Sequence, residues 1–76
     1  MTEKEKAFLI GLRKLSFETG IVICGCGCCG SPYLEERNDL SLDAGYIVDD
    51  GTDFVRWIDK KYDSFHWEKE KNRIIK

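Results

Sequence analysis

The sequence predicts a small α+β domain, in which an N-terminal helix packs on a mostly antiparallel sheet of about three strands. Three observations lead to this fold class. Apolar residues recur at helical spacing near the N-terminus, and two later stretches are rich in β-branched and aromatic residues. The length of 76 residues leaves room for one hydrophobic core only. The whole chain, residues 1–76, is therefore expected to form a single domain.

Residues 3–19 are expected to form the helix. Phe8, Leu12 and Leu15 recur at i, i+4 and i+7 and give one apolar stripe. Gly11 lies inside this helix, where glycine costs about 1 kcal/mol relative to alanine. This position is therefore interpreted as one where another backbone comes close.

Both ends of the predicted helix carry capping signals. Thr2 and Glu5 have the spacing of a capping box, in which each side chain accepts from the backbone N–H of the other residue. Gly20 is suited to the left-handed conformation that ends many helices. These residues fix the expected bounds of the helix.

Residues 21–28 are expected to form a strand, because they open with three β-branched residues. Side chains alternate between the faces of a strand, so Val22 would share one face with Cys24, Cys26 and Cys28. Gly25 and Gly27 would lie on the other face. Glycines make that face thin, so that a helix, a ligand or a second copy of the chain could approach it closely.

The segment after this strand is expected to turn into a helix. Gly30 ends the strand, Ser31 is suited to an N-cap, and Pro32 to the first position of a short helical turn. This turn is expected to reach about Arg37, with residues 38–41 forming a loop.

Residues 45–58 are expected to form a β-hairpin, because two β-rich runs, 46–48 and 54–58, flank an Asp-Gly pair. In the second run Arg56 projects from one face and Trp57 from the other, and apolar residues accompany both. A hairpin that is partly apolar on both faces is expected to carry helices on both, or to meet a partner.

The C-terminal tail, residues 62–76, is open to two interpretations. A helix over residues 64–73 is one, and an extended final segment at residues 74–75 is the alternative.

Charge is distributed unevenly along the chain. Residues 31–53 carry a net charge of −6 (seven acidic, one basic), and residues 54–76 carry +3 (seven basic, four acidic). The two regions could pair within a chain or between chains, and both could also be solvated surface. The overall net charge of −2 does not favour nucleic acid as a partner, since a basic stripe on a basic domain is missing.

The location expected from the sequence is the cytoplasm. The longest apolar run is far shorter than the roughly 18–20 residues that a membrane span needs. The N-terminus is polar and mixed in charge, with no pattern of a signal peptide. We therefore expect reduced thiols and no membrane partner.

The main candidate site is the cysteine- and glycine-rich segment that spans residues 24–32. A glycine-rich bend between a strand and a helix start presents backbone N–H groups to an anion, although the pattern of a nucleotide-binding P-loop is missing. The residues expected to contact such a ligand are Gly25, Cys26, Gly27, Cys28, Cys29, Gly30, Ser31, Arg56 and Trp57.

Other interpretations of the cysteines stay open. No resident metal or other cofactor is the main expectation, and the alternative is one zinc ion held by Cys24, Cys26, Cys29 and His66. A redox dithiol at residues 26–29 lacks the thioredoxin-type context. Finally, free cysteine behaves as a small buried apolar residue, so the cluster could serve packing, including packing between two copies of the chain.

The sequence does not predict an enzyme. It suggests neither a pair of carboxylates for acid–base chemistry nor a nucleophile with an adjacent base. The nine aromatic residues are numerous for so small a core, and Trp, Tyr and Arg are the residues that most often anchor interfaces. They could equally fill the core.

The motif Gly-Cys-Gly-Cys-Cys-Gly-Ser-Pro at residues 25–32, with the helix end and strand at residues 15–24, resembles a group of small proteins of phages and prophages of Gram-positive bacteria. The likeness covers under half of the chain, and no residue role follows from it. It implies an accessory protein of an infected cell. Such proteins commonly act by binding, for example by blocking a host defence protein or sequestering a nucleotide signal.

Together these expectations describe a non-enzymatic, phage-type accessory protein that forms a homo-oligomer. The leading expectation is an anti-defence protein that captures a small anionic, nucleotide-derived ligand. One alternative is an inhibitor that uses its acidic middle region against a host protein. The other is a zinc-stabilised structural module.

Overall fold

The computed structural model of the chain describes residues 2–25, 32–48 and 54–75. These parts contain, in chain order, α1 (Glu3–Thr19), β1 (Ile21–Cys24), β2 (Tyr33–Glu36), β3 (Gly45–Val48), β4 (Val55–Ile58), α2 (Ser64–Glu70) and the 3₁₀ turn η1 (Lys71–Arg73). β1 pairs with β2 and β3 with β4, both antiparallel. The α+β class is confirmed; within the described residues four strands form two small sheets, whereas one sheet of about three strands was expected.

Helix α1 has the predicted bounds and caps. The Thr2 hydroxyl accepts from Glu5 N at 3.1 Å, and Glu5 Oε1 accepts from Thr2 N at 3.3 Å, which completes the capping box. Gly20 ends the helix at φ 75°. Gly11 was expected to lie where another backbone comes close. Within the described chain no backbone does so, because a Cβ built at Gly11 would have no neighbouring atom of these residues within 4 Å.

The prediction of a helical turn from Pro32 to about Arg37 is wrong, because strand β2 occupies this region. Cys24 lies opposite Tyr33 and Ile21 opposite Glu36, so β2 runs back along β1. Cross-strand pairing outweighs the local preference for a helix start, and a proline just before a strand is compatible with pairing. β1 itself ends at Cys24, and the predicted strand residues 26–28 lie outside the described residues.

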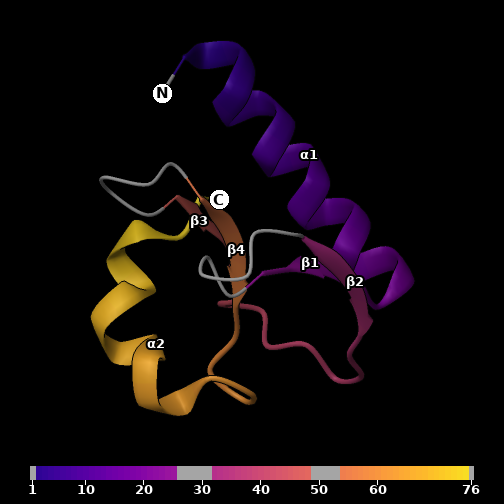
Figure 1. The fold of residues 1–76 in the computed structure, drawn as a ribbon, viewed down its shortest axis with the longest axis vertical. Helices are drawn as coiled ribbons and strands as arrows, with labels where there is room; N and C mark the ends of the chain where they lie inside the picture. Colours follow the sequence, from indigo (N-terminus) through magenta and orange to yellow (C-terminus); the bar gives the residue numbers. More distant parts are fainter. Residues whose placement is uncertain (1, 26–31, 49–53, 76) are drawn as a thin grey trace.

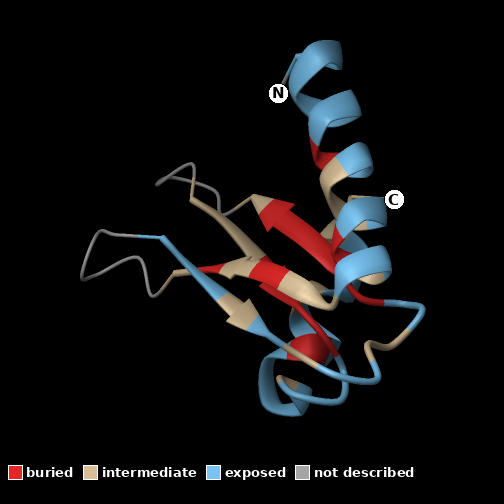
Figure 2. Cartoon of the chain, turned by 90° about the vertical axis from the view of Figure 1, so that its right-hand side faces the viewer, coloured by how far each residue is buried: buried red, intermediate tan, exposed pale blue. Residues whose placement is uncertain are grey.

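β3 and β4 pair as predicted and pack on both faces, while the predicted turn at residues 49–53 lies outside the described residues. Tyr46 lies opposite Trp57, and the two rings meet edge to face at 4.9 Å in the core beneath α1. On the other face Ile47 and Ile58 pack against Trp67 of α2. The two helices accordingly lie on opposite sides of the strands (Figure 1), and the buried residues gather along the strands between them (Figure 2). The expectation of helices on both faces is confirmed.

The C-terminal tail combines the two interpretations left open by the sequence. The chain is helical through α2 and η1, and Ile75 then pairs with β3 by donating its N–H to Tyr46 O at 2.9 Å. Among the described residues, no helix has the length and apolar character that crossing a bilayer requires.

Candidate functional site

The cysteine- and glycine-rich segment connects β1 to β2. The pairing of Cys24 with Tyr33 brings the two ends of the segment together, and a Cβ on Gly25 would lie 3.8 Å from Pro32 Cα. The segment therefore joins two paired strands and does not lead into a helix N-terminus. Of the predicted ligand residues in it, Gly25 is described, while the others lie outside the described residues, namely Cys26, Gly27, Cys28, Cys29, Gly30 and Ser31.

A polar cluster lies next to this segment and is called the Cys24 network here. Its members are Cys24, Glu35, Arg37, Tyr62 and Asp63. Arg37 donates from Nε to Glu35 Oε2 at 2.8 Å and from Nη1 to Asp63 Oδ2 at 2.9 Å. The Cys24 thiol donates to the same Glu35 oxygen at 3.4 Å, and the Arg37 guanidinium lies over the Tyr62 ring at 5.1 Å. The network thus joins β1, β2 and the turn that leads into α2.

The Cys24 side chain is a protonated thiol at neutral pH. Burial raises its pKa to about 11, and its hydrogen bond to Glu35 acts in the same direction. A nucleophile or a metal ligand requires the thiolate instead. Cys24 also belongs to the core cluster that contains Val22 and Trp57. Packing is therefore the role that its surroundings support.

The Cys24 network carries one excess negative charge. Hydrogen bonds from Arg37 and from the Cys24 thiol lower the pKa of Glu35, so this carboxyl is ionised at neutral pH. Glu35 and Asp63 together outweigh the single charge of Arg37. Their side chains are 41% and 30% exposed, so both side chains are partly accessible to solvent. This arrangement attracts a cation more readily than an anion.

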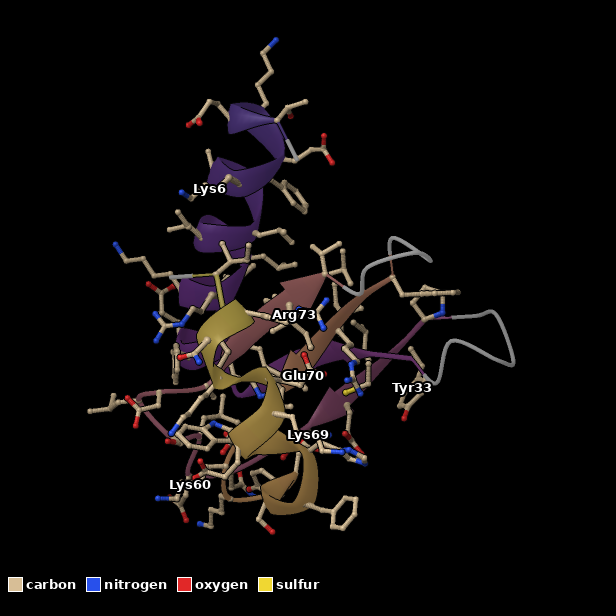
Figure 3. The ribbon with its side chains drawn as sticks, turned by 90° about the vertical axis from the view of Figure 1, so that its left-hand side faces the viewer. Lys6, Tyr33, Lys60, Lys69, Glu70 and Arg73 are labelled. Atoms are coloured by element: carbon tan, nitrogen blue, oxygen red, sulfur yellow. The ribbon has the colours of Figure 1, made fainter. Side chains whose placement is uncertain are left out.

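Two tyrosines stand beside the exposed carboxylates. Tyr33 lies on the same face of the β1–β2 ribbon as Glu35 and is 55% exposed, and Figure 3 shows it on β2. Tyr62, which is 43% exposed, donates its hydroxyl to the Asn38 carbonyl oxygen and is held in place by it. Tyrosine rings beside carboxylates provide both a charged and an aromatic surface for a cationic group.

The two predicted ligand residues on β4 lie elsewhere. Trp57 is buried in the core, where its ring meets those of Tyr46 and Phe17 edge to face. Arg56, on the opposite face, pairs with Glu70 of α2 at 3.6 Å. Glu70 also accepts from Arg73 at 2.8 Å, as the two labelled side chains in Figure 3 indicate. A ligand would reach Trp57 only by opening the core.

The described members of the alternative zinc set lie in different surroundings. Cys24 is buried in the core cluster, whereas His66 is exposed on α2, where its ring packs against Phe65. Cys26 and Cys29 lie outside the described residues. In the described part of the chain, no three His, Cys, Asp or Glu side chains lie close enough together to hold a metal ion.

Asp59 positions part of the Cys24 network, and the sequence analysis missed it. Its fully buried carboxylate accepts from Ser41 N at 3.0 Å and from Lys61 N at 2.8 Å. Its backbone N–H donates to Asp63 Oδ2 at 3.2 Å. An aspartate directly after a predicted strand, followed by polar residues, is a signal for this kind of turn.

Comparison with protein-family models, with curated proteins and with solved structures gives no match for this chain.

Proposed function

We propose that this chain is a non-enzymatic accessory binding protein, of the phage type that its cysteine- and glycine-rich motif resembles, and that it blocks a basic site on a host protein. The observation that carries this proposal is the excess negative charge of the Cys24 network. Arg56, which the sequence predicts as an anion contact, and Arg37 in the network both already face carboxylates. The contact surface is the exposed side of the network together with Tyr33.

The chemistry of this surface suits a lysine or arginine side chain of the partner. The partly exposed carboxylates of Glu35 and Asp63 accept from a cationic donor, and the Tyr33 ring packs against its apolar stem or its charge. The net charge of −6 over residues 31–53 also attracts a basic surface during the encounter. Because Asp59 and Arg37 fix the carboxylates in place, little side-chain entropy is lost on binding.

A small anionic, nucleotide-derived ligand is the second candidate, and the connection between β1 and β2 favours it. Glycine-rich connections between paired strands offer backbone N–H groups to phosphate, and rigid strands position such loops well. The helix N-terminus that would have added a favourable dipole is replaced by β2. The compensated charge of Arg37 also contributes little attraction for an anion.

The two candidates respond differently to the loss of one carboxylate. In the test, the immobilised chain is exposed to lysate of a Gram-positive host, and captured proteins are quantified by mass spectrometry at low and high salt. The variant is Glu35→Gln, and the matched control is Glu68→Gln, which removes an exposed carboxylate from α2. We expect one basic host protein that wild type and Glu68→Gln retain, and that Glu35→Gln and high salt release.

A reciprocal measurement identifies the protein contact directly. The captured protein, once purified, should bind with a Kd that rises about tenfold for Glu35→Gln, since hydrogen bonds to a charged group contribute about 1.5–3 kcal/mol. Native mass spectrometry of the purified chain with a panel of nucleotides, without added metal, tests the other candidates. A bound nucleotide, or one zinc ion per chain, together with no capture that depends on Glu35, would reject the protein-inhibitor proposal.

A further inference from the structure

One face of α1 consists of exposed residues and is called the α1 outer face here. Successive helical residues are rotated by about 100°, so five side chains of α1 fall within an arc of about 80°. They are Lys4, Phe8, Gly11, Leu15 and Glu18. The buried residues Leu9 and Ser16 lie on the opposite side of the helix. Phe8 and Leu15 are large apolar residues, yet they are 68% and 51% exposed.

An apolar groove adjoins this face. It lies between α1 and the β1–β2 ribbon, has a volume of about 300 Å³, and is lined mainly by Leu12, Leu15, Ile21, Ile23 and Leu34. Leu34 is 72% exposed on the rim. The helix edge that carries Phe8 and Leu15 is the edge that borders the groove. The apolar surface is therefore continuous from α1 onto β1 and β2.

Gly11 lies at the centre of the α1 outer face, and nothing within the described chain explains it. A glycine inside a helix costs about 1 kcal/mol relative to alanine. Its conformation is helical, so no unusual backbone angle calls for glycine, and a Cβ there would touch no atom of the described chain. A missing side chain at this point lets another helix come close to α1.

The charges on this face are arranged to pair with those of a second copy. Lys4 precedes Gly11 by as many residues as Glu18 follows it. When two such helices cross antiparallel at Gly11, Lys4 of each copy lies opposite Glu18 of the other. The same register places Phe8 of one copy next to Leu15 of the other, on the edge that borders the groove. The antiparallel crossing thus places opposite charges against each other and apolar residues against each other. This self-complementarity is what a twofold-symmetric contact requires.

We propose that two copies of this chain form a dimer in which the α1 helices cross antiparallel at Gly11 and Phe8 of each copy enters the apolar groove of the other. The N-terminal half of α1 projects beyond the sheets, so a second helix can lie along it (Figure 1). This dimer surface lies on α1 and one face of β1 and β2, and the contact does not rest on the proposed function.

The test is a charge swap measured by sedimentation equilibrium at micromolar to sub-millimolar concentrations. Wild type is expected at twice the chain mass of 8.8 kDa. Lys4→Glu alone places like charges together at two symmetric points, so we expect the dimer Kd to rise about tenfold, and likewise for Glu18→Lys alone. The double variant restores opposite charges and should return the Kd to within about threefold of wild type.

Two further variants separate the interface from general effects of charge. Lys6→Glu, on a different side of α1, is the matched control and should leave the Kd unchanged (Figure 3). Phe8→Glu should give a monomer with unchanged far-UV circular dichroism, because Phe8 is exposed and contributes little to the core. A monomeric wild type would overturn the proposal. A dimer that Phe8→Glu leaves intact, or single swaps that the double variant does not rescue, would overturn it as well.

Discussion

The hydroxyl oxygens of Ser16 and Tyr46 lie 2.8 Å apart in the core, where both residues are buried. Tyr46 Oη also accepts from Ile23 N at 3.0 Å, on the edge of β1 that faces away from β2. One phenol from β3 therefore satisfies a hydroxyl of α1 and a backbone N–H of β1. This contact holds the two sheets and α1 together, because the two sheets share no ladder of hydrogen bonds.

We predict that Tyr46→Phe lowers the free energy of unfolding by about 2 kcal/mol, since a buried donor without a partner costs about 1–3 kcal/mol. Urea denaturation followed by circular dichroism measures the loss. Tyr33→Phe is the control, because Tyr33 is largely exposed, and it should change the midpoint by much less. Equal effects of the two substitutions would show that the Tyr46 hydroxyl does not have this role.

Asp59 is the second polar residue on which the fold depends. Its carboxylate accepts two backbone N–H groups from different loops. Asp59→Asn keeps the shape but leaves a single acceptor oxygen, and we expect it to lower the free energy of unfolding by about 1–3 kcal/mol. The exposed Asp43→Asn should have little effect. A thermal melt of the two variants compares them directly, and an unchanged melting temperature for Asp59→Asn would contradict the assigned role.

The thiol of Cys24 predicts a loss of stability in alkali. Its pKa in the folded state, about 11, is above the unfolded value of about 8.5, so the folded chain holds this proton more strongly. The contribution is fully present below the unfolded pKa and is lost as pH rises through the folded pKa. Between pH 8.5 and 11 the free energy of unfolding should therefore fall more steeply in wild type than in Cys24→Ala. Parallel curves for the two proteins would argue against a buried thiol.

Because of Glu35, we expect the free energy of unfolding to fall as the pH is lowered into the acid range. Its pKa is lowered in the folded state by hydrogen bonds from Arg37 and then from Cys24. The stability it contributes is present above its unfolded pKa of about 4.3 and is lost as pH falls through the folded value. Below about pH 5, the urea concentration at the unfolding midpoint should fall less steeply with decreasing pH in Glu35→Gln than in wild type. If the decline keeps the wild-type slope, the contact with Arg37 contributes no stability.

The local signals in the sequence correctly predicted the elements that depend on neighbouring residues. The capping box at Thr2, the left-handed Gly20 and the Asp-Gly hairpin act over a few positions, and the structure confirms the first two and the pairing of β3 with β4. The alternation along β4 also placed Arg56 and Trp57 on opposite faces. Periodicity and capping are sufficient for such elements because their stabilising contacts are close in sequence.

The errors occurred where distant residues decide the outcome. Ser31 and Pro32 favour a helix start locally, but pairing with β1 makes the next residues a strand. Similarly, Arg56 is predicted to contact an anion, because the sequence does not show that it pairs with Glu70 of α2. Asp59 was overlooked because its partner Ser41 comes from a distant loop. The candidate site therefore changed its electrostatic character once the long-range contacts were known.

The last prediction concerns Gly45 and Gly11. We expect substitution by alanine to have opposite effects on the free energy of unfolding at these two positions. A Cβ at Gly45 would lie 2.5 Å from Ile74 Cγ2 and 3.0 Å from Arg13 Cδ, and Arg13 is held by hydrogen bonds to the Ala44 and Leu42 carbonyls. Gly45→Ala should therefore lower the free energy of unfolding by about 1–3 kcal/mol, as overpacking does. Gly11→Ala has free space and a helical backbone, so the unfolding free energy of the monomer should rise by about 0.5–1 kcal/mol.

Urea denaturation in the Lys4→Glu background, in which association is weakened, measures both effects on the monomer. The same Gly11→Ala substitution in the wild-type background adds a methyl group at the proposed helix crossing, so it should weaken the dimer while it stabilises the monomer. Sedimentation equilibrium gives the dimer Kd of this variant. A more stable monomer with an unchanged dimer Kd would mean that the helices do not approach closely at Gly11, and that the glycine has no role in association.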